Sequence, residues 1–238
     1  MHNELILILT LILEFSGVVL SYVLFRKAGL YFWTILATIA ANIEVLILVR
    51  AFGMNMTLGN ILFASTFLVT DILSELYGKH AANTAVKLGI ATTVCFVAIS
   101  SSWLLYRPAA DDTMMPPIRA VFSHTPRVML ASLAVYVIVQ FFDVWLYHAW
   151  WNFTTKKTGD KERFLWLRNN GSTLVSQLLN TVLYTWFAFA GVYDTKTLVS
   201  IAVSSYVIFI VTSLADTPFI YLCRAISRRQ SGKKPDLE

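Results

Sequence analysis

The sequence predicts an all-α integral membrane protein, built as a polytopic bundle of about seven transmembrane helices. Of its 238 residues, 57% are hydrophobic and only 14% are charged, and the mean hydropathy is +0.63. A soluble domain of this length would need far more polar surface to cover its core. The apolar residues run almost continuously without an alternating period, which disfavours a transmembrane barrel. The chain is therefore expected to cross the bilayer several times as helices.

Each expected crossing is an apolar segment of about 20 residues, the length that spans a bilayer as a helix. Seven segments qualify: 5–25, 30–49, 58–77, 84–106, 128–151, 171–191 and 198–222. A count of six stays open. No basic residue precedes the first segment and no small-residue cleavage pattern follows it, so it is not expected to be a removable signal. We expect a single membrane domain over 1–222 and a basic cytoplasmic tail over 223–238.

The charges of the connecting segments predict the orientation. Of the 19 basic residues, 14 lie in the odd-numbered connections and the tail: Arg26, Lys27, Lys79, Lys87, Lys156, Lys157, Lys161, Arg163, Arg168, Arg224, Arg228, Arg229, Lys233 and Lys234. The amino terminus is therefore expected outside and the carboxyl terminus in the cytoplasm of a plasma-membrane protein. This bias and anionic lipid account for the net charge of +5 without a nucleic-acid partner.

Carboxylates inside the expected spans are the strongest functional signal. There are six: Glu14, Glu44, Asp71, Glu75, Asp143 and Asp216. An acid at the bilayer centre costs roughly 2.5–3.5 kcal/mol on insertion scales. A helix-to-helix hydrogen bond would explain one such acid but explains six together poorly. We expect them to face the interior of the bundle or a wet cavity.

Polar residues recur at helical spacing on four of the expected spans. Three of these stripes continue over several turns: Tyr136, Gln140, Asp143 and Tyr147; Thr173, Gln177, Asn180 and Tyr184; Ser205, Thr212 and Asp216. Asp71 and Glu75 share one face of a fourth helix. The rise of 1.5 Å per residue puts Asp71, Asn180 and Thr212 near the midplane, where secondary transporters bind substrate. The stripes therefore predict a polar site inside the bundle.

Catalytic and metal-binding motifs are missing from the sequence. It contains no G-x-x-x-x-G-K-[ST] phosphate loop, no H-E-x-x-H and no nucleophile elbow. The four histidines are scattered, and Cys95 and Cys223 lie apart in apolar runs, where they are expected to be small buried hydrophobes. We expect no metal, no cofactor and no catalytic residue.

A short internal match suggests an inverted repeat. STFLV at 65–69 lies in the third expected span and STLV at 172–175 lies in the sixth. An offset of three spans would reverse the direction of the second copy, as in inverted-repeat transporters. Four matched residues make this a weak prediction.

Four segments together resemble one family: TDILSELYGK at 70–79, QFFDVW at 140–145, RNNGSTLVSQLLNT at 168–181 and LADTPFIYL at 214–222. They resemble the queuosine precursor transporter family, also called the vitamin uptake transporter family, from the second span to the end. The resemblance implies import of deazaguanine bases for the queuosine of tRNA: 7-cyano-7-deazaguanine, 7-aminomethyl-7-deazaguanine or queuine.

A substrate site follows from the stripes and this resemblance together. Carboxylates and side-chain amides can read the donors of a guanine-like edge, and aromatic rings can stack on the flat base. The expected substrate-binding residues are Asp71, Glu75, Gln140, Asp143, Arg168, Asn170, Thr173, Gln177, Asn180 and Asp216.

Two positions depart from the family pattern. Family members often carry an aspartate where this chain has Asn180 and a lysine where it has Phe209. Loss of one partner of a buried ion pair would leave the other charge unpaired, at a cost of several kcal/mol. We therefore infer that the two residues replace an ion pair as a unit.

Three functions stay open at this point. The leading interpretation is a secondary transporter or facilitator for queuosine precursors. The second is a substrate-binding subunit of an energy-coupling-factor importer, which would require ATPase partners. The third is an intramembrane enzyme. The sequence leaves a homo-oligomer, the coupling ion and the particular deazaguanine open.

Overall fold

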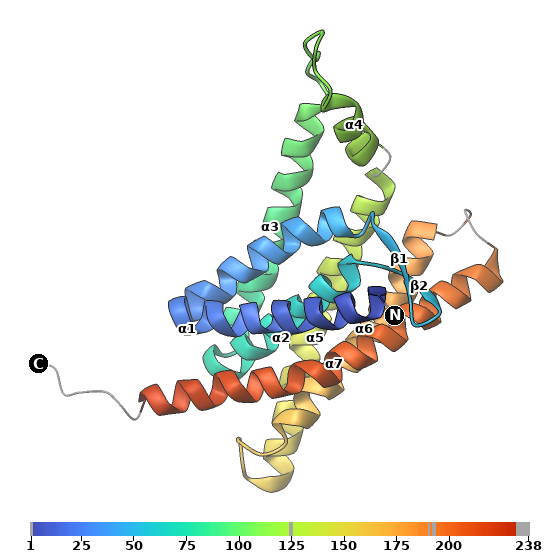
Figure 1. Ribbon diagram of the computed structural model, residues 1–238. Helices are drawn as coiled ribbons and strands as arrows, with labels where there is room; N and C mark the ends of the chain where they lie inside the picture. The colour runs from blue at the N-terminus through green and yellow to red at the C-terminus, as the bar shows by residue number, and fades with distance from the viewer. Residues whose placement is uncertain (1, 124–125, 190, 192–193, 232–238) are drawn as a thin grey trace, which may run out of the picture.

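The computed structural model describes residues 2–123, 126–189, 191 and 194–231, and its described part is almost entirely helical (Figure 1). The helices are α1 (His2–Glu44), α2 (Gly59–Tyr77), α3 (Lys79–Trp103), α4 (Met115–Ser123), α5 (Pro126–Thr158), α6 (Leu165–Phe189) and α7 (Thr195–Ser231). Two short strands, β1 (Leu48–Ala51) and β2 (Met54–Thr57), connect α1 to α2. The polytopic helical bundle expected from the sequence is confirmed.

Helix α1 is a hairpin of two antiparallel arms. Arg26 has a non-helical backbone (φ 56°, ψ −132°), and the chain reverses direction there (Figure 1). The arms touch closely, since a Cβ at Gly17 would lie 2.4 Å from the Trp33 ring, and one at Gly29 would lie 1.9 Å from the Ser21 carbonyl oxygen. Only glycine fits at either position. The first two expected spans are thus the two arms of one element.

The segment 48–57 is a short non-helical connection within the all-α bundle and corrects one boundary of the expected spans. It forms an antiparallel hairpin in which Leu48 pairs with Thr57 and Ala51 with Met54. Phe52 and Gly53 both have positive φ at the turn, as a two-residue hairpin loop requires. Ala51 and Met56 are buried in a small apolar cluster. The expected second span is therefore too long: its helix ends at Glu44, and the hairpin begins at Leu48.

Within the described part of the chain, five helices are long and apolar enough to cross a membrane: α1, α2, α3, Ala131–Thr158 of α5 and Thr195–Arg229 of α7. Helix α2 is the most enclosed, with 78% of its most apolar stretch buried against 22% for α7. Helix α6 is absent from this set because many of its residues are polar. Its 25 residues would still extend about 38 Å, and it packs between α5 and α7.

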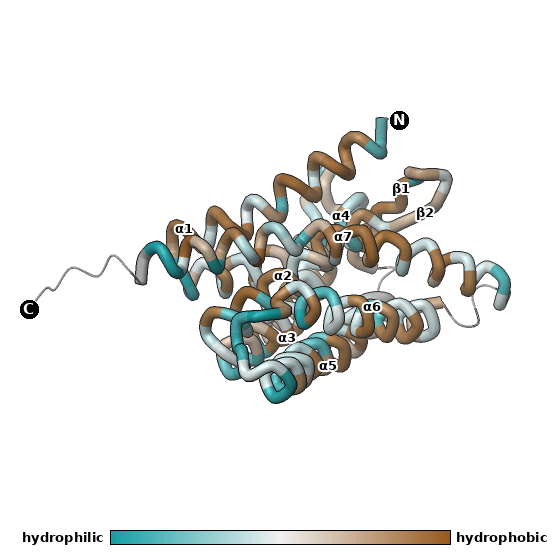
Figure 2. The backbone as a smooth tube through the Cα atoms, turned by 90° about the horizontal axis from the view of Figure 1, so that it is seen from below, coloured by the Kyte–Doolittle hydropathy of each residue, from teal (hydrophilic) through white to brown (hydrophobic). Residues whose placement is uncertain are grey.

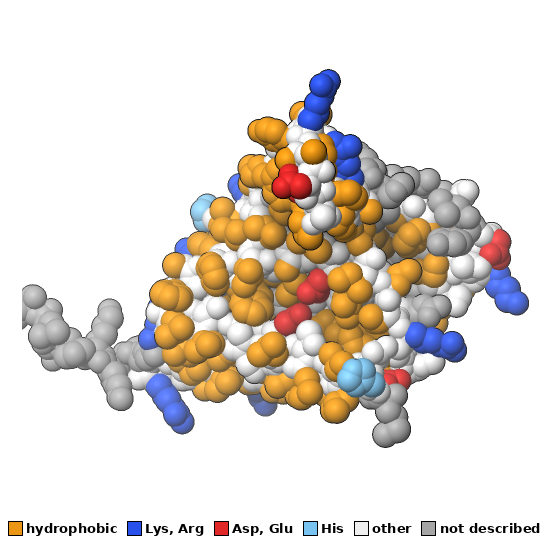
Figure 3. Space-filling view, turned by 45° about the horizontal axis from the view of Figure 1, so that its top comes forward, with side chains coloured by type: hydrophobic (Ala, Val, Ile, Leu, Met, Phe, Trp, Pro, Cys, Tyr) orange, Lys and Arg blue, Asp and Glu red, His pale blue; other side chains and the backbone are white. Residues whose placement is uncertain are grey.

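The exposed surface of the bundle is largely apolar. Large exposed side chains include Leu13, Leu20, Val94 and Trp186. Figure 2 shows hydrophobic residues distributed along most of the helices, and Figure 3 shows hydrophobic side chains over much of one face, with acidic side chains among them near its middle and Lys and Arg mainly near its margins. Such a surface suits contact with lipid, and it confirms a multi-pass membrane protein.

The basic connections meet at one end of the bundle. The Lys27 Nζ lies 5.7 Å from the centre of the Tyr77 ring, which joins the turn of α1 to the end of α2. Arg224 of α7 approaches Glu75 at 3.4 Å and donates to the Glu162 carbonyl oxygen. At the opposite end, Asn3 donates to the carbonyl oxygen of Arg50 in the β-hairpin. We call these the basic end and the hairpin end; Lys233 and Lys234 lie outside the described residues.

Helices α2 and α6 run in opposite directions, as the predicted inverted repeat requires. The carboxyl end of α2 meets the amino end of α6 through Glu75 and Arg168. Asn60 and Asn180, near the other ends of the two helices, line one pocket. The match of four residues is otherwise untested, so the repeat stays a prediction.

Cysteine labelling tests the predicted orientation, with the basic end in the cytoplasm. In a Cys95→Ala, Cys223→Ala background, Lys161→Cys and Arg229→Cys should resist a membrane-impermeant maleimide in intact cells and react after permeabilisation. Asp111→Cys, in the exposed connection beyond α3, should react in both cases. Labelling of Lys161→Cys or Arg229→Cys in intact cells would contradict the positive-inside argument.

Candidate functional site

The interior between α2, α5, α6 and α7 is polar. Nine of the ten predicted site residues are buried, and the side chain of the tenth, Glu75, is only 4% exposed. They come from all four helices, as the stripes predicted. In an apolar environment, an unpartnered polar group costs several kcal/mol, so these side chains face one another rather than lipid.

Helix α6 contributes most of the polar side chains. Its buried face includes Arg168, Asn169, Thr173, Gln177 and Asn180. Asn169, Thr173, Gln177 and Asn180 recur at three- and four-residue intervals, which places them along one side of the helix, and Arg168 directly precedes Asn169. Because that side is polar, α6 is stable in a bilayer only with polar partners from its neighbours.

Three aspartates form the centre of the site, and we call them the acid cluster: Asp71 of α2, Asp143 of α5 and Asp216 of α7. The Thr173 hydroxyl donates to Asp71 Oδ2 at 3.2 Å. The Asn169 amide donates to Asp216 Oδ1 at 2.7 Å. Asn169 and Thr173 lie one helical turn apart on α6, and Ser176, which faces Asp143, lies three residues further, so the three carboxylates approach the same stretch of α6.

Many hydrogen-bonding atoms of the site have no partner among the described residues. Asp143 faces Ser176 of α6, but neither of its carboxylate oxygens accepts a hydrogen bond of normal geometry. The same is true of Asp71 Oδ1, and Gln177 Nε2 has no acceptor. Buried polar atoms are usually satisfied, so this group of unsatisfied atoms inside one bundle leaves hydrogen-bonding capacity for a polar ligand or for water.

A salt bridge separates the acid cluster from the basic end. Arg168 Nη2 donates to Glu75 Oε1 at 2.7 Å and Arg168 Nε donates to Oε2 at 2.9 Å. The Tyr147 hydroxyl donates to Glu75 Oε2 at 2.8 Å. The guanidinium also lies over the Trp151 ring, 4.4 Å from its centre. We call Glu75, Arg168 and Tyr147 the inner bridge.

The inner bridge borders a second polar region at the basic end. A pocket there is lined by Glu75, Leu76, Trp151, Lys161, Glu162, Arg224, Ser227 and Arg228. Arg224 connects the two regions, since it approaches both Glu75 and Glu162. Arg228 also pairs with Glu162. The bridge thus closes the acid cluster off from this pocket.

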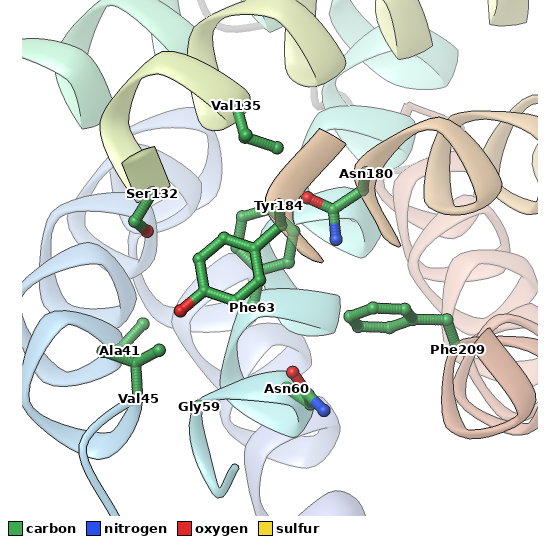
Figure 4. Close-up of a pocket in the computed structure, with 10 residues that line it drawn as sticks. All are labelled: Ala41, Val45, Gly59, Asn60, Phe63, Ser132, Val135, Asn180, Tyr184 and Phe209. Carbon is green, nitrogen blue, oxygen red and sulfur yellow. The ribbon is translucent and has the colours of Figure 1, made fainter. Parts of the chain in front are cut away.

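On the side of the hairpin end, a pocket opens near Asn180 (Figure 4). It encloses about 420 Å³ of empty space including its mouth, and its lining residues are Ala41, Val45, Gly59, Asn60, Phe63, Ser132, Val135, Asn180, Tyr184 and Phe209. The rings of Phe63, Tyr184 and Phe209 give it an aromatic lining (Figure 4). We call it the aromatic pocket.

Polar contacts lead from the aromatic pocket toward the acid cluster. The Asn180 amide donates to Gln177 Oε1 at 3.2 Å. Gln177 lies one helical turn from Thr173, which contacts Asp71. Gln140 of α5 donates to the Thr66 hydroxyl at 2.7 Å, one turn before Thr70 and Asp71 on α2. The pocket, the acid cluster and the inner bridge therefore follow one another along the bundle.

Two predicted site residues have most of their polar atoms engaged by the protein. The Arg168 guanidinium pairs with Glu75 and also donates to the Arg163 carbonyl oxygen. The Asn170 amide donates to Thr217, and its oxygen accepts from Ser213. Both residues have clear structural roles here, and their contact with substrate stays a prediction.

Several residues of the site were not predicted. Asn169 and Ser176 lie beside the acid cluster. Each is next in sequence to a predicted site residue, but neither was predicted itself. Phe63 lines the aromatic pocket, two turns before Asp71 on α2. Extending the Asp71 stripe by two turns would have included Phe63, but apolar residues carried no signal in a search for polar stripes.

Known proteins match this chain over most of its length. The model of the family described as "Putative vitamin uptake transporter" matches residues 57–223. A protein of Bacillus subtilis (strain 168), named "Probable queuosine precursor transporter", is 37% identical over 224 residues, which cover 94% of this chain and 96% of that protein. No solved structure matches the chain.

The inner bridge should contribute strongly to stability. Glu75→Gln leaves the fully buried Arg168 without its charge partner, so we expect a loss of about 3–5 kcal/mol in the free energy of unfolding. The control is Glu162→Gln, which also removes a partner of Arg224 but whose side chain is 67% exposed; its loss should stay below about 1 kcal/mol. Unfolding in mixed micelles by added dodecyl sulfate measures both, and equal losses would contradict a buried pair.

Asn180 and Phe209 line the same pocket, with both side chains directed into it (Figure 4). If they replace an ion pair, Asn180→Asp alone and Phe209→Lys alone should each cost up to several kcal/mol through an unpaired charge. The double variant should recover much of that loss. A double-mutant cycle on thermal stability measures the coupling, and a value near zero would show that the positions act independently.

Proposed function

Since this chain belongs to the vitamin uptake transporter family, we propose that it imports queuosine precursors, the deazaguanine bases used to modify tRNA, and binds them at the acid cluster. The observation that carries this proposal is the set of buried carboxylate and amide atoms without partners, enclosed by four helices. A structural polar network would be expected to satisfy its own atoms.

The chemistry of the site suits a guanine-like base. The N1–H and the exocyclic amine of such a base are adjacent donors, which one carboxylate accepts in a bidentate arrangement. Asp71 Oδ1 is unengaged, while Oδ2 is held by Thr173. The Gln177 amide nitrogen can donate to the ring carbonyl of the base. The aromatic pocket offers rings on which a flat base can stack as it enters.

The inner bridge lies between the acid cluster and the basic end of the bundle. We propose that the aromatic pocket is the entry from outside and that the Glu75–Arg168 contact blocks release into the cytoplasm in this state. Release then requires separation of the bridge, as alternating access demands of a site near the midplane. Arg224 and Glu162, next to the bridge, are placed to accept new partners when it opens.

The proposal has two competitors that differ in what they require. A substrate-binding subunit of an energy-coupling-factor importer would need ATPase partners for uptake. An intramembrane enzyme would change its substrate chemically. Uptake of an unmodified base by the purified chain alone in proteoliposomes supports the proposal over both.

The proposal is tested in cells that can neither make queuosine nor import its precursors. Expression of this chain with a deazaguanine in the medium should restore queuosine in tRNA, measured by mass spectrometry of the nucleosides. Asp71→Asn removes the proposed acceptor of the base edge and should lower the yield at least tenfold at equal membrane expression.

The matched control is Asp111→Asn, the same chemical change in the exposed connection beyond α3, which should behave as the wild type. Absence of queuosine with the wild-type chain for every precursor supplied would refute the proposed function. Normal uptake by Asp71→Asn would leave the transporter assignment standing but would remove Asp71 from the site.

A further inference from the structure

The acid cluster is not balanced by charges of the protein. Asp71, Asp143 and Asp216 are at most 2% exposed. Among the described residues, no Lys, Arg or His forms an ion pair with any of the three; the nearby buried cation, Arg168, is held by Glu75 in the inner bridge. Several unpaired carboxylates in a membrane interior repel one another and lack solvation, so they require protons or a cation.

Uncharged groups without partners also point into this region. Ser176 Oγ and Gln177 Nε2 of α6 and Gln140 Oε1 of α5 are fully buried and unsatisfied. Ser176 faces Asp143, and Gln140 lies one helical turn before Asp143 on the same helix. The unsatisfied atoms include donors and acceptors on α5, the helix of Asp143, and on α6, which packs against it; a ligand with its own donors and acceptors would satisfy both kinds.

Queuosine precursors differ in charge at the substituent on the five-membered ring. An aminomethyl group carries a primary aliphatic amine, which is protonated at neutral pH like the amine of lysine. The side-chain amine of queuine is a cation as well. A cyano group is neutral. The substituent therefore decides whether the ligand itself brings the positive charge that the acid cluster lacks.

Resting on the proposed function, we propose that the acid cluster makes this transporter selective for precursors that carry an ammonium group over neutral ones. The amino edge of the base and the substituent on the five-membered ring lie on opposite sides of the bicyclic system, so one carboxylate cannot contact both. The acid cluster supplies carboxylates from three different helices, which allows the two ends of the base to be read by different residues.

Asp143 is the partner assigned to the ammonium. Asp71 already accepts a hydrogen bond from Thr173, and Asp216 accepts one from Asn169. Asp143 accepts none of normal geometry at either oxygen. An ammonium brings three donors and a full positive charge, and it can satisfy both Asp143 oxygens in a way that a nitrile, which has no donor, cannot.

The test compares ligands of matched size on the purified full-length chain in nanodiscs. The probes are 7-aminomethyl-, 7-hydroxymethyl- and 7-cyano-7-deazaguanine; the hydroxymethyl compound has nearly the shape of the aminomethyl compound but no charge. We expect the aminomethyl compound to bind at least tenfold more tightly than either neutral one, a difference of about 1.4 kcal/mol.

Equal affinities for the aminomethyl and hydroxymethyl compounds would mean that a proton or an inorganic cation balances the acid cluster. That result would overturn the selectivity proposal and leave the transporter proposal intact. Failure of all three compounds to bind would overturn both. The comparison uses the wild-type chain, so it does not depend on the folding of any variant.

A pair of variants tests the assignment to Asp143. Asp143→Asn should bring the ratio of aminomethyl to hydroxymethyl affinity close to one. The control is Glu14→Gln, which also neutralises a buried carboxylate but on α1, a helix that contributes no residue to the acid cluster; it should keep the wild-type ratio. An unchanged ratio in Asp143→Asn would show that the ammonium does not bind there.

Discussion

The constraint that organises this protein is the cost of a polar group in hydrocarbon. Helix α6 illustrates it: Arg168, Asn169, Thr173 and Gln177 would be unfavourable against lipid, and all are buried between neighbouring helices. Helices α5 and α7 flank α6 and present Asp143 and Asp216 to it. Helix α6 turns its polar side to its neighbours and exposes apolar side chains such as Val182 and Trp186, so the constraint that shapes the bundle also gathers the polar groups inside it.

Buried charge is handled in two different ways along one line of residues. In the inner bridge, Glu75 and Arg168 neutralise each other with bidentate geometry, and Tyr147 adds a hydrogen bond. In the acid cluster, no described Lys, Arg or His pairs with any of the three carboxylates. The first arrangement is complete without a ligand, whereas the second is not. On this account, that difference distinguishes the structural contact from the proposed binding site, although both lie within the same group of four helices.

Much of the site could be predicted because two simple rules act together. Acids are costly in the membrane, and helical periodicity shows which side of a helix they share, so Asp71, Asp143, Gln177 and Asp216 were predicted to face inward. The contacts between these groups were not predictable, because the spacing of polar residues shows which side of a helix they share but not which residue of a neighbouring helix they contact. The contact of Glu75 with Arg168, 93 positions apart, depends on how α2 and α6 pack.

The errors have local causes. Segment 48–57 was assigned partly to a span because its apolar residues continue the preceding run, although Gly53 at a turn favours a hairpin. Helix α6 was expected as a span, but it falls outside the set of strongly apolar helices because its buried side is polar. Phe63 was not predicted, because the sequence does not distinguish an aromatic residue that lines a pocket from one that packs in the core.

The central claim is that the acid cluster is where the transported base binds. It is tested most directly by an experimental structure of the protein in nanodiscs with 7-aminomethyl-7-deazaguanine bound. The account predicts density for the base between α2, α5, α6 and α7, within hydrogen-bonding distance of Asp71 and with its amine beside Asp143. The account would be contradicted by density for the base only in the pocket at the basic end, with no ligand at the acid cluster and its carboxyl groups hydrogen-bonded to one another.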